Sequence, residues 1–197
     1  MIRMRDRPPE DLPTLRQLET ELAREKDCRR YGRILQSTAC MLLMAAAAAV
    51  LAATLWLPVL RICGASMAPT LSAGEIVVAR KGADVRCGDV IAFYYNNKIL
   101  VKRVIAGPGQ WVDMEDDGTV RVDGDPLDEP YLAEKAPGSC DISLPYQVPD
   151  GRFFVMGDHR AVSVDSRHSA IGCVAEEQIV GRVVLRVWPL SSLGGIA

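Results

Sequence analysis

An apolar segment from Ile34 to Leu60 carries no charged side chain, and it constrains the fold of this chain more than any other feature. At about 1.5 Å per residue, a helix over most of this segment would reach about 36 to 40 Å, enough to cross a bilayer. A cleaved secretory signal has a shorter apolar core that follows a short basic start. Because 33 residues precede the segment, we expect an uncleaved transmembrane helix over residues 34–60.

Basic residues indicate how this helix would be oriented. Three arginines precede the segment closely and one follows it: Arg29, Arg30, Arg33 and Arg61. Basic residues near a membrane span concentrate on the cytoplasmic side. The pattern therefore predicts a cytoplasmic tail over residues 1–33 and an extracytoplasmic domain over 61–197, in a single-pass protein of the cell membrane. A formal net charge of -2 gives no reason to expect a nucleic acid partner.

Short apolar runs between turn residues predict β-strands in the second part of the chain. The runs are Glu75 to Ala79, Asp89 to Tyr95, Ile99 to Ile105, Gln110 to Met114, Thr119 to Val122, Arg152 to Met156 and Arg182 to Trp188. Asp117 with Gly118, and Asp123 with Gly124, have the composition of tight hairpin turns. We therefore expect a mainly β fold, built as an antiparallel β-sheet domain that follows one transmembrane helix.

The cysteines show no spacing typical of a metal site. They are Cys28, Cys40, Cys63, Cys87, Cys140 and Cys173, and no two of them form a CxxC pair. We therefore predict no metal site. The last four would lie in an extracytoplasmic space, where disulfides persist. A disulfide between Cys140 and Cys173 is one reading of the sequence, and free buried thiols are an equally good one.

Ser66, in the segment Gly64–Leu71, is a candidate nucleophile just beyond the apolar segment. A serine hydroxyl reacts only when a neighbouring base takes its proton. The chain has two histidines, His159 and His168, and Asp158 adjoins the first, so a serine, histidine and aspartate triad is one hypothesis. Adjacent residues usually point apart, so Asp158 is poorly placed to orient His159.

Lys102 is the alternative base. In a strand it shares a face with Leu100 and Val104, whose apolar side chains would desolvate its ammonium group. Arg103 occupies the other face beside equally apolar neighbours, so alternation alone does not decide which cation is buried. Only lysine can lose its proton. Lowering the pKa of a lysine by three units takes about 4 kcal/mol, which burial can supply.

Four blocks of the sequence, in order, resemble those of the bacterial type I signal peptidases. These are membrane-anchored serine endopeptidases that remove signal peptides from exported proteins. The blocks are residues Ser66–Leu71, Gly88–Phe93, Lys102–Gly109 and Gly157–Arg167. The likeness extends from the apolar segment almost to the C-terminus, and it implies a compact form of the signal-peptidase-like antiparallel β-sheet catalytic domain.

The resemblance also implies roles for individual residues. Ser66 would be the nucleophile and Lys102 its general base, with the Ser163 hydroxyl orienting the lysine nitrogen. Met67 would form part of the wall of the substrate pocket. Four charged residues would hold the site together: Asp158, Arg160, Asp165 and Arg167, the last two as an ion pair.

Two positions depart from the family pattern. Gly64 lacks the hydroxyl that some relatives use as a second oxyanion donor, so the backbone N–H of Ser66 would depend on other backbone groups or water for help. His159 stands where many relatives have asparagine. Because the block around Lys102 is intact, we expect His159 to be structural.

The implied substrates are preproteins, whose signal peptides would bind as an added β-strand. The resemblance thus implies two partners besides the substrate, the lipid bilayer and the nearby protein export machinery, and it requires no cofactor. One alternative is a dedicated or non-catalytic relative that assists assembly of a pilus or another surface protein. A non-catalytic relative is expected to have lost the lysine, whereas this chain retains Lys102.

Overall fold

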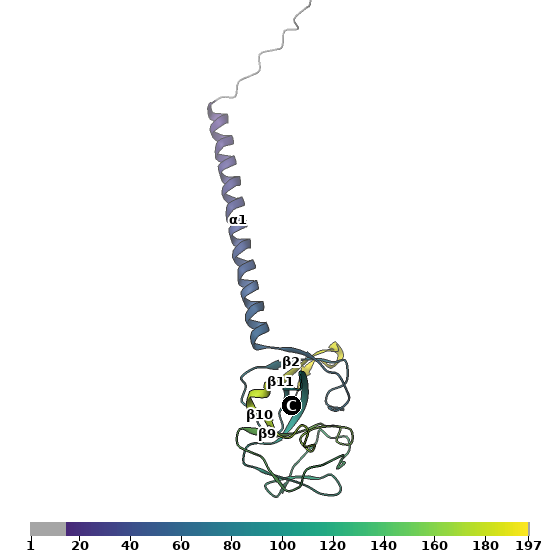
Figure 1. The fold of residues 1–197 in the computed structure, drawn as a ribbon. Helices are drawn as coiled ribbons and strands as arrows, with labels where there is room; N and C mark the ends of the chain where they lie inside the picture. Colours follow the sequence, from purple (N-terminus) through teal and green to yellow (C-terminus); the bar gives the residue numbers. More distant parts are fainter. Residues whose placement is uncertain (1–14, 197) are drawn as a thin grey trace, which may run out of the picture. The chain divides into compact units, whose positions relative to one another are not determined.

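A computed structural model describes residues 15–196 and divides the chain into two compact units between Ala52 and Ala53. The helix α1 (Leu15–Trp56) accounts for the described part of the first unit, and every strand belongs to the second (Figure 1). The β-rich unit begins with the last turn of α1.

The helix α1 is continuous over 42 residues and therefore begins well before the predicted start at residue 34. It contains no proline, and its second half includes the alanine run Ala45–Ala49, which favours helix. All side chains from Ile34 to Trp56 are exposed. One 18-residue window of α1 has a mean hydropathy of 2.2, so length and composition would allow the helix to cross a membrane. Residues 15–33 of the predicted tail are thus helical, and the rest of that tail lies outside the described residues.

The predicted C-terminal bound of the helix, Leu60, is wrong by four residues. The helix ends at Trp56, and Val59–Arg61 forms strand β1. Pro58 explains the difference, because proline has no N–H and disfavours the helical conformation of the residue before it. The backbone of β1 instead pairs with strand β2 (Ile76–Arg80).

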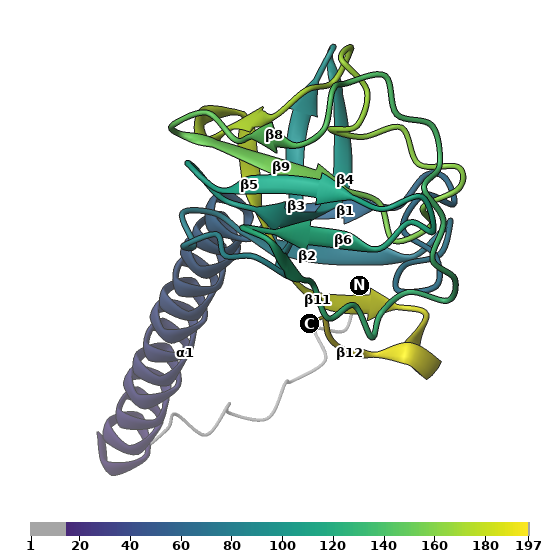
Figure 2. The same cartoon turned by 90° about the horizontal axis from the view of Figure 1, so that it is seen from below.

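The β-rich unit contains two antiparallel sheets (Figure 2). The larger has eight strands in the order β1-β2-β11-β3-β4-β9-β10, with β12 beside β11. Its further strands are β3 (Val90–Tyr95), β4 (Lys98–Ala106), β9 (Arg152–Met156), β10 (Val174–Ala175), β11 (Ile179–Trp188) and β12 (Gly194–Gly195). The smaller sheet, ordered β7-β6-β5-β8, is made of β5 (Trp111–Met114), β6 (Val120–Val122), β7 (Asp125–Pro126) and β8 (Tyr146–Gln147). Two short 3-10 helices, Glu176–Gln178 and Leu190–Ser192, flank β11.

The predicted mainly β, antiparallel fold is therefore confirmed. Each of the predicted apolar runs overlaps a strand, and Asp117 with Gly118 lies in the turn between β5 and β6. One tight hairpin was not predicted. It joins β3 to β4 through Asn96 and Asn97, which have φ of 44° and 61°, and asparagine tolerates this left-handed region better than most residues.

Strand β4 is the central feature for the site, because its second half is buried on both faces. Every residue from Lys102 to Ala106 is buried. In a strand with one face in solvent, buried and exposed residues would alternate. Lys102 faces Ser163 and Arg103 faces Asp158. The question that alternation left open is therefore answered: both cations are buried.

The described part of the chain contains no disulfide. The thiols of Cys40, Cys63, Cys87, Cys140 and Cys173 are all free in residues 15–196. Of the two readings of Cys140 and Cys173, the structure has the one with free thiols. Burial raises the pKa of the Cys173 thiol to about 11, so this thiol is unreactive at neutral pH.

Candidate active site

Ser66 lies in the loop that connects β1 to β2. Met67 and Leu71 fix this loop, since both side chains are buried in the hydrophobic core with residues of β2 and β3. The N–H of Leu71 donates to the carbonyl of Met67 at 2.8 Å. Gly64 has a φ of 116°, and a Cβ there would meet nothing within 4 Å. Backbone conformation, not crowding, therefore favours glycine at this position.

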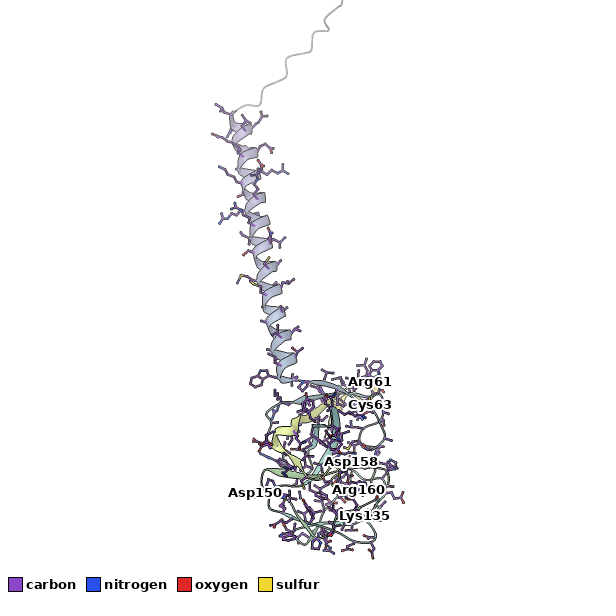
Figure 3. All side chains as sticks on the ribbon, viewed as in Figure 1. Arg61, Cys63, Lys135, Asp150, Asp158 and Arg160 are labelled. Atoms are coloured by element: carbon purple, nitrogen blue, oxygen red, sulfur yellow. The ribbon has the colours of Figure 1, made fainter. Side chains whose placement is uncertain are left out.

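Ser66 and Lys102 line the same cavity, of about 130 Å³. One wall is the stretch 61–64 together with Ser66 and Met67, and the other is residues 99–102 of β4. Arg61 and Cys63, labelled in Figure 3, belong to the first wall. The structure thus brings the two predicted dyad residues to one cleft, with Met67 in its wall.

The Lys102 side chain is almost fully buried, at 3% exposure. Its Nζ donates a hydrogen bond of 2.8 Å to the Ser163 hydroxyl, and among residues 15–196 it forms no ion pair. Burial is the largest influence and lowers the pKa of Lys102 to about 8. The charges of Asp165 and Asp158 act in the opposite direction, and that of Arg167 adds to the lowering.

Ser163 is held between the lysine and an acidic neighbour. Its hydroxyl is also hydrogen-bonded to Asp165, which forms the expected ion pair with Arg167 at 2.9 Å. Burial raises the pKa of Asp165, but its hydrogen bonds from Arg167, Ser163 and Gly157 outweigh that effect and hold the pKa below its usual range. Asp165 therefore stays ionised and fixes the direction of the Ser163 hydroxyl.

Gly157 lies between Ser163 and the loop that carries Ser66. A Cβ on Gly157 would collide with the Ser163 Oγ and the Ser66 carbonyl oxygen. That same carbonyl accepts a hydrogen bond of 3.1 Å from the N–H of His159. Ser66 and Ser163 thus approach each other closely only because residue 157 has no side chain.

Asp158 and Arg160 also lie in this region, although each pairs with a residue that the sequence did not single out. Asp158 accepts two hydrogen bonds from Arg103, at 3.0 and 2.9 Å, and one of 2.5 Å from Thr70. Arg160 pairs with Glu129. Figure 3 labels Asp158 and Arg160 within the β-rich unit. Arg103 could have been suspected from its position beside Lys102, whereas Glu129 has no sequence signal.

Neither histidine lines the cavity that contains Ser66 and Lys102. The His159 side chain is exposed, and only its backbone N–H contacts Ser66. His168 does have a carboxylate nearby, since its Nδ1 lies 3.8 Å from Asp141, but neither residue of this pair lines the cavity. The arrangement gives no support to a triad.

The model of the protein family described as signal peptidase, peptidase S26, matches residues 35–188 of this chain. The chain belongs to this signal peptidase family. Signal peptidase IB of Staphylococcus aureus (strain COL) is 40% identical over 148 residues, which cover 65% of this chain and 76% of that protein. Signal peptidase I T of Bacillus subtilis (strain 168) is 36% identical over 143 residues, covering 66% and 73%.

Among solved structures, a signal peptidase I from Enterococcus faecalis V583 matches with a TM-score of 0.44 and 31% identity. The match covers 51% of this chain and 97% of that chain. The predicted family is thus confirmed by the sequence matches, and the S26 signal peptidases are serine endopeptidases that cleave signal peptides.

Proposed function

We propose that this chain cleaves the signal peptides of preproteins with Ser66 as nucleophile and Lys102 as general base. The family supports the activity. The observation that carries the residue assignment is the shared cavity of Ser66 and Lys102, with Lys102 buried and its pKa lowered to about 8. At pH 7 about a tenth of such lysines are neutral, against about one in 2,500 at an ordinary pKa.

Ser163 would aim the free electron pair of the neutral lysine. The Ser163 oxygen accepts an N–H from Lys102 at 2.8 Å. This hydrogen bond fixes one of the N–H groups of the amine. The electron pair is then free to point into the cleft and take the proton of Ser66.

In the first half of the reaction, the Ser66 oxygen attacks the carbonyl carbon while Lys102 takes its proton. The backbone N–H of Ser66 would stabilise the oxyanion that forms. The lysine ammonium then donates a proton to the leaving amine of the mature protein, and an acyl-enzyme remains. In the second half Lys102 takes a proton from water, whose oxygen attacks the ester carbonyl. Lys102 then returns this proton to the departing Ser66 oxygen, and the signal peptide is released as a carboxylic acid.

The cleft supports recognition of a small extended peptide. Its walls include Ile62, Leu100 and Val101, which are apolar, and its volume of about 130 Å³ is small. A peptide strand between the two walls would satisfy its backbone through hydrogen bonds, with shallow space for alanine-sized side chains. We propose this strand addition as the mode of signal peptide binding.

The N-terminal helix would anchor the enzyme in the lipid bilayer, with residues 1–33 on the cytoplasmic side and the β-rich unit outside. The exposed apolar side chains of α1 and the basic residues before them support this arrangement. There the enzyme would meet preproteins as they leave the export machinery. In intact spheroplasts, a membrane-impermeant maleimide should label exposed Cys87. If Cys87 were labelled only after lysis, the β-rich unit would lie on the cytoplasmic side and the proposed orientation would be wrong.

The decisive test of the residue assignment is cleavage of a preprotein by single variants of the full chain in detergent. Ser66→Ala and Lys102→Met should each reduce cleavage by more than about 10³-fold, because each removes a group that acts on the reacting atoms. His159→Asn and His168→Ala are matched controls that should retain most activity. In the wild type, kcat should rise with pH through a midpoint near 8 as Lys102 loses its proton.

A folded Lys102→Met protein with substantial activity would refute the dyad, and loss of activity in His159→Asn would revive the triad. Neither a dedicated assembly factor nor a silent relative is favoured, since the S26 match includes Ser66 and Lys102.

A further inference from the structure

Residues 129–131 belong to an irregular segment between β7 and β8 of the smaller sheet, and they contribute two polar side chains to the protein interior. The Glu129 carboxylate is 1% exposed, and Tyr131 is half-buried. The Tyr131 hydroxyl donates to Glu129 at 2.7 Å. Neither residue lines the cavity of Ser66 and Lys102.

Glu129 reaches the catalytic loop through Arg160. Its two oxygens accept hydrogen bonds from both terminal nitrogens of that guanidinium group. The Nε of Arg160 in turn donates to the Gly157 carbonyl at 3.2 Å. Since Gly157 packs directly against Ser163 and the Ser66 carbonyl, Glu129 fixes the loop on which those two serines depend.

Tyr131 reaches the base strand through Arg103. The guanidinium carbon of Arg103 lies 3.9 Å from the centroid of the Tyr131 ring, a cation–π contact. Arg103 is the residue after Lys102 and binds Asp158, which accepts a hydrogen bond from the hydroxyl of Thr70 in the loop that carries Ser66. Tyr131 therefore supports the side of β4 opposite to Lys102.

We propose that Glu129 and Tyr131 are positioning residues that set the distance between Ser66 and Lys102 by clamping Arg160 and Arg103. This inference rests on the proposed function of the dyad. The clamp acts on both partners at once, because one arginine holds the loop beside Ser66 and the other follows Lys102 in β4. Chemistry of this kind is sensitive to small displacements, so losing the clamp should affect kcat most.

Four variants of the full chain in detergent separate the parts of the clamp. Glu129→Gln keeps the shape but removes the charge, and should lower kcat about 10-fold or more. Glu129→Asp should restore part of the loss. Tyr131→Phe keeps the ring over Arg103 and should lower kcat only about 3-fold, whereas Tyr131→Leu should cost about 10-fold. KM should stay within about 2-fold throughout, since neither residue lines the cleft.

The control is Asp128→Asn, an exposed carboxylate that directly precedes Glu129 in the chain, which should leave kcat and KM unchanged. The substrate is a fluorogenic peptide with alanine at the first and third positions before the cut. The pH profile adds a second readout. Lys102 is influenced by Asp165, Arg167 and Asp158, and an unneutralised Arg160 would add positive charge, so the acidic limb of kcat in Glu129→Gln should move to lower pH.

Two results would overturn the clamp. One is a kcat that falls only with the folded fraction and keeps the wild-type pH profile, which would make Glu129 merely structural. The other is a raised KM at unchanged kcat, which would make it a substrate contact. If Ser66→Ala still cleaves, the dyad itself fails; if Ser66→Ala is inactive and Glu129→Gln is normal, only the clamp fails.

Discussion

Lys102 and Arg103 are neighbours in β4, and both are buried, but only Arg103 has a counter-charge. Arg103 is matched by the carboxylate of Asp158, whereas the hydrogen-bond partner of Lys102 is the neutral hydroxyl of Ser163. Arginine stays protonated in proteins, so burying it requires a counter-charge. Lysine can give up its proton, so burial without a carboxylate produces a base.

The same rule holds for the other buried arginines of the described chain. Arg160 pairs with Glu129 and Arg167 pairs with Asp165, and all four side chains are at most 1% exposed. Neither pair includes the lysine. Buried positive charge therefore occurs in two forms: arginines paired with carboxylates, and one lysine whose lowered pKa suits the general base that we propose.

Arg103→Met should have the largest effect on stability, because it breaks a buried ion pair from one side. The change leaves the Asp158 carboxylate buried without its main counter-charge, which typically costs about 3–5 kcal/mol. Denaturant unfolding of the full chain in detergent, followed by tryptophan fluorescence, measures the free energy of unfolding. The exposed pair of Arg121 and Glu115 is the control, and Arg121→Met should cost less than about 1 kcal/mol.

An Arg103→Met protein as stable as the wild type would show that Asp158 does not need this partner, and the contrast between the two faces of β4 would lose its basis. Arg103→Lys sharpens the point. It keeps the charge but loses the two-pronged geometry of the guanidinium group, so its cost should lie between those of the wild type and the methionine variant.

The strands and the hairpin turns were predictable from local patterns, since apolar runs and turn residues act over a few positions. The strand conformation at residues 59 and 60 was not predictable in this way, because the same apolar sequence is compatible with a membrane helix and with an edge strand. Pro58 favours the end of the helix. The sequence pattern also could not predict that Lys102 and Arg103 are both buried. Alternation assumes that one face of a strand is solvated, and here loops cover both.

For the site, the resemblance indicated Ser66 and Lys102, which line one cavity, and Ser163, which accepts a hydrogen bond from Lys102. The ion pair of Asp165 with Arg167 is also present. The partners of Asp158 and Arg160 could not be predicted. Arg160 lies 31 positions from Glu129 in the chain, and pairing over such a distance depends on tertiary structure. A carboxylate in an irregular segment carries no pattern that distinguishes it from a solvated one.

Lys102→Met should stabilise the protein at neutral pH, which is the opposite of Arg103→Met. In the folded protein the pKa of Lys102 is about 8, against about 10.4 in the unfolded chain. Below pH 8 the lysine is charged in both states, so its burial disfavours the folded state by on the order of 3 kcal/mol. Methionine has a similar length and no charge, and therefore removes this cost.

The pH dependence of that gain tests its cause. Between about pH 8 and 10.4 the unfolded chain binds a proton that the folded protein does not, so wild-type stability rises with pH relative to the variant. The advantage of Lys102→Met should thus shrink as the pH is raised and be lost near pH 10. Lys98, exposed at the start of β4, provides the control, since Lys98→Met should show neither the gain nor its loss. A stability difference that stayed constant from pH 6 to 10 would mean that packing, and not an uncompensated charge, distinguishes Lys102 from Arg103.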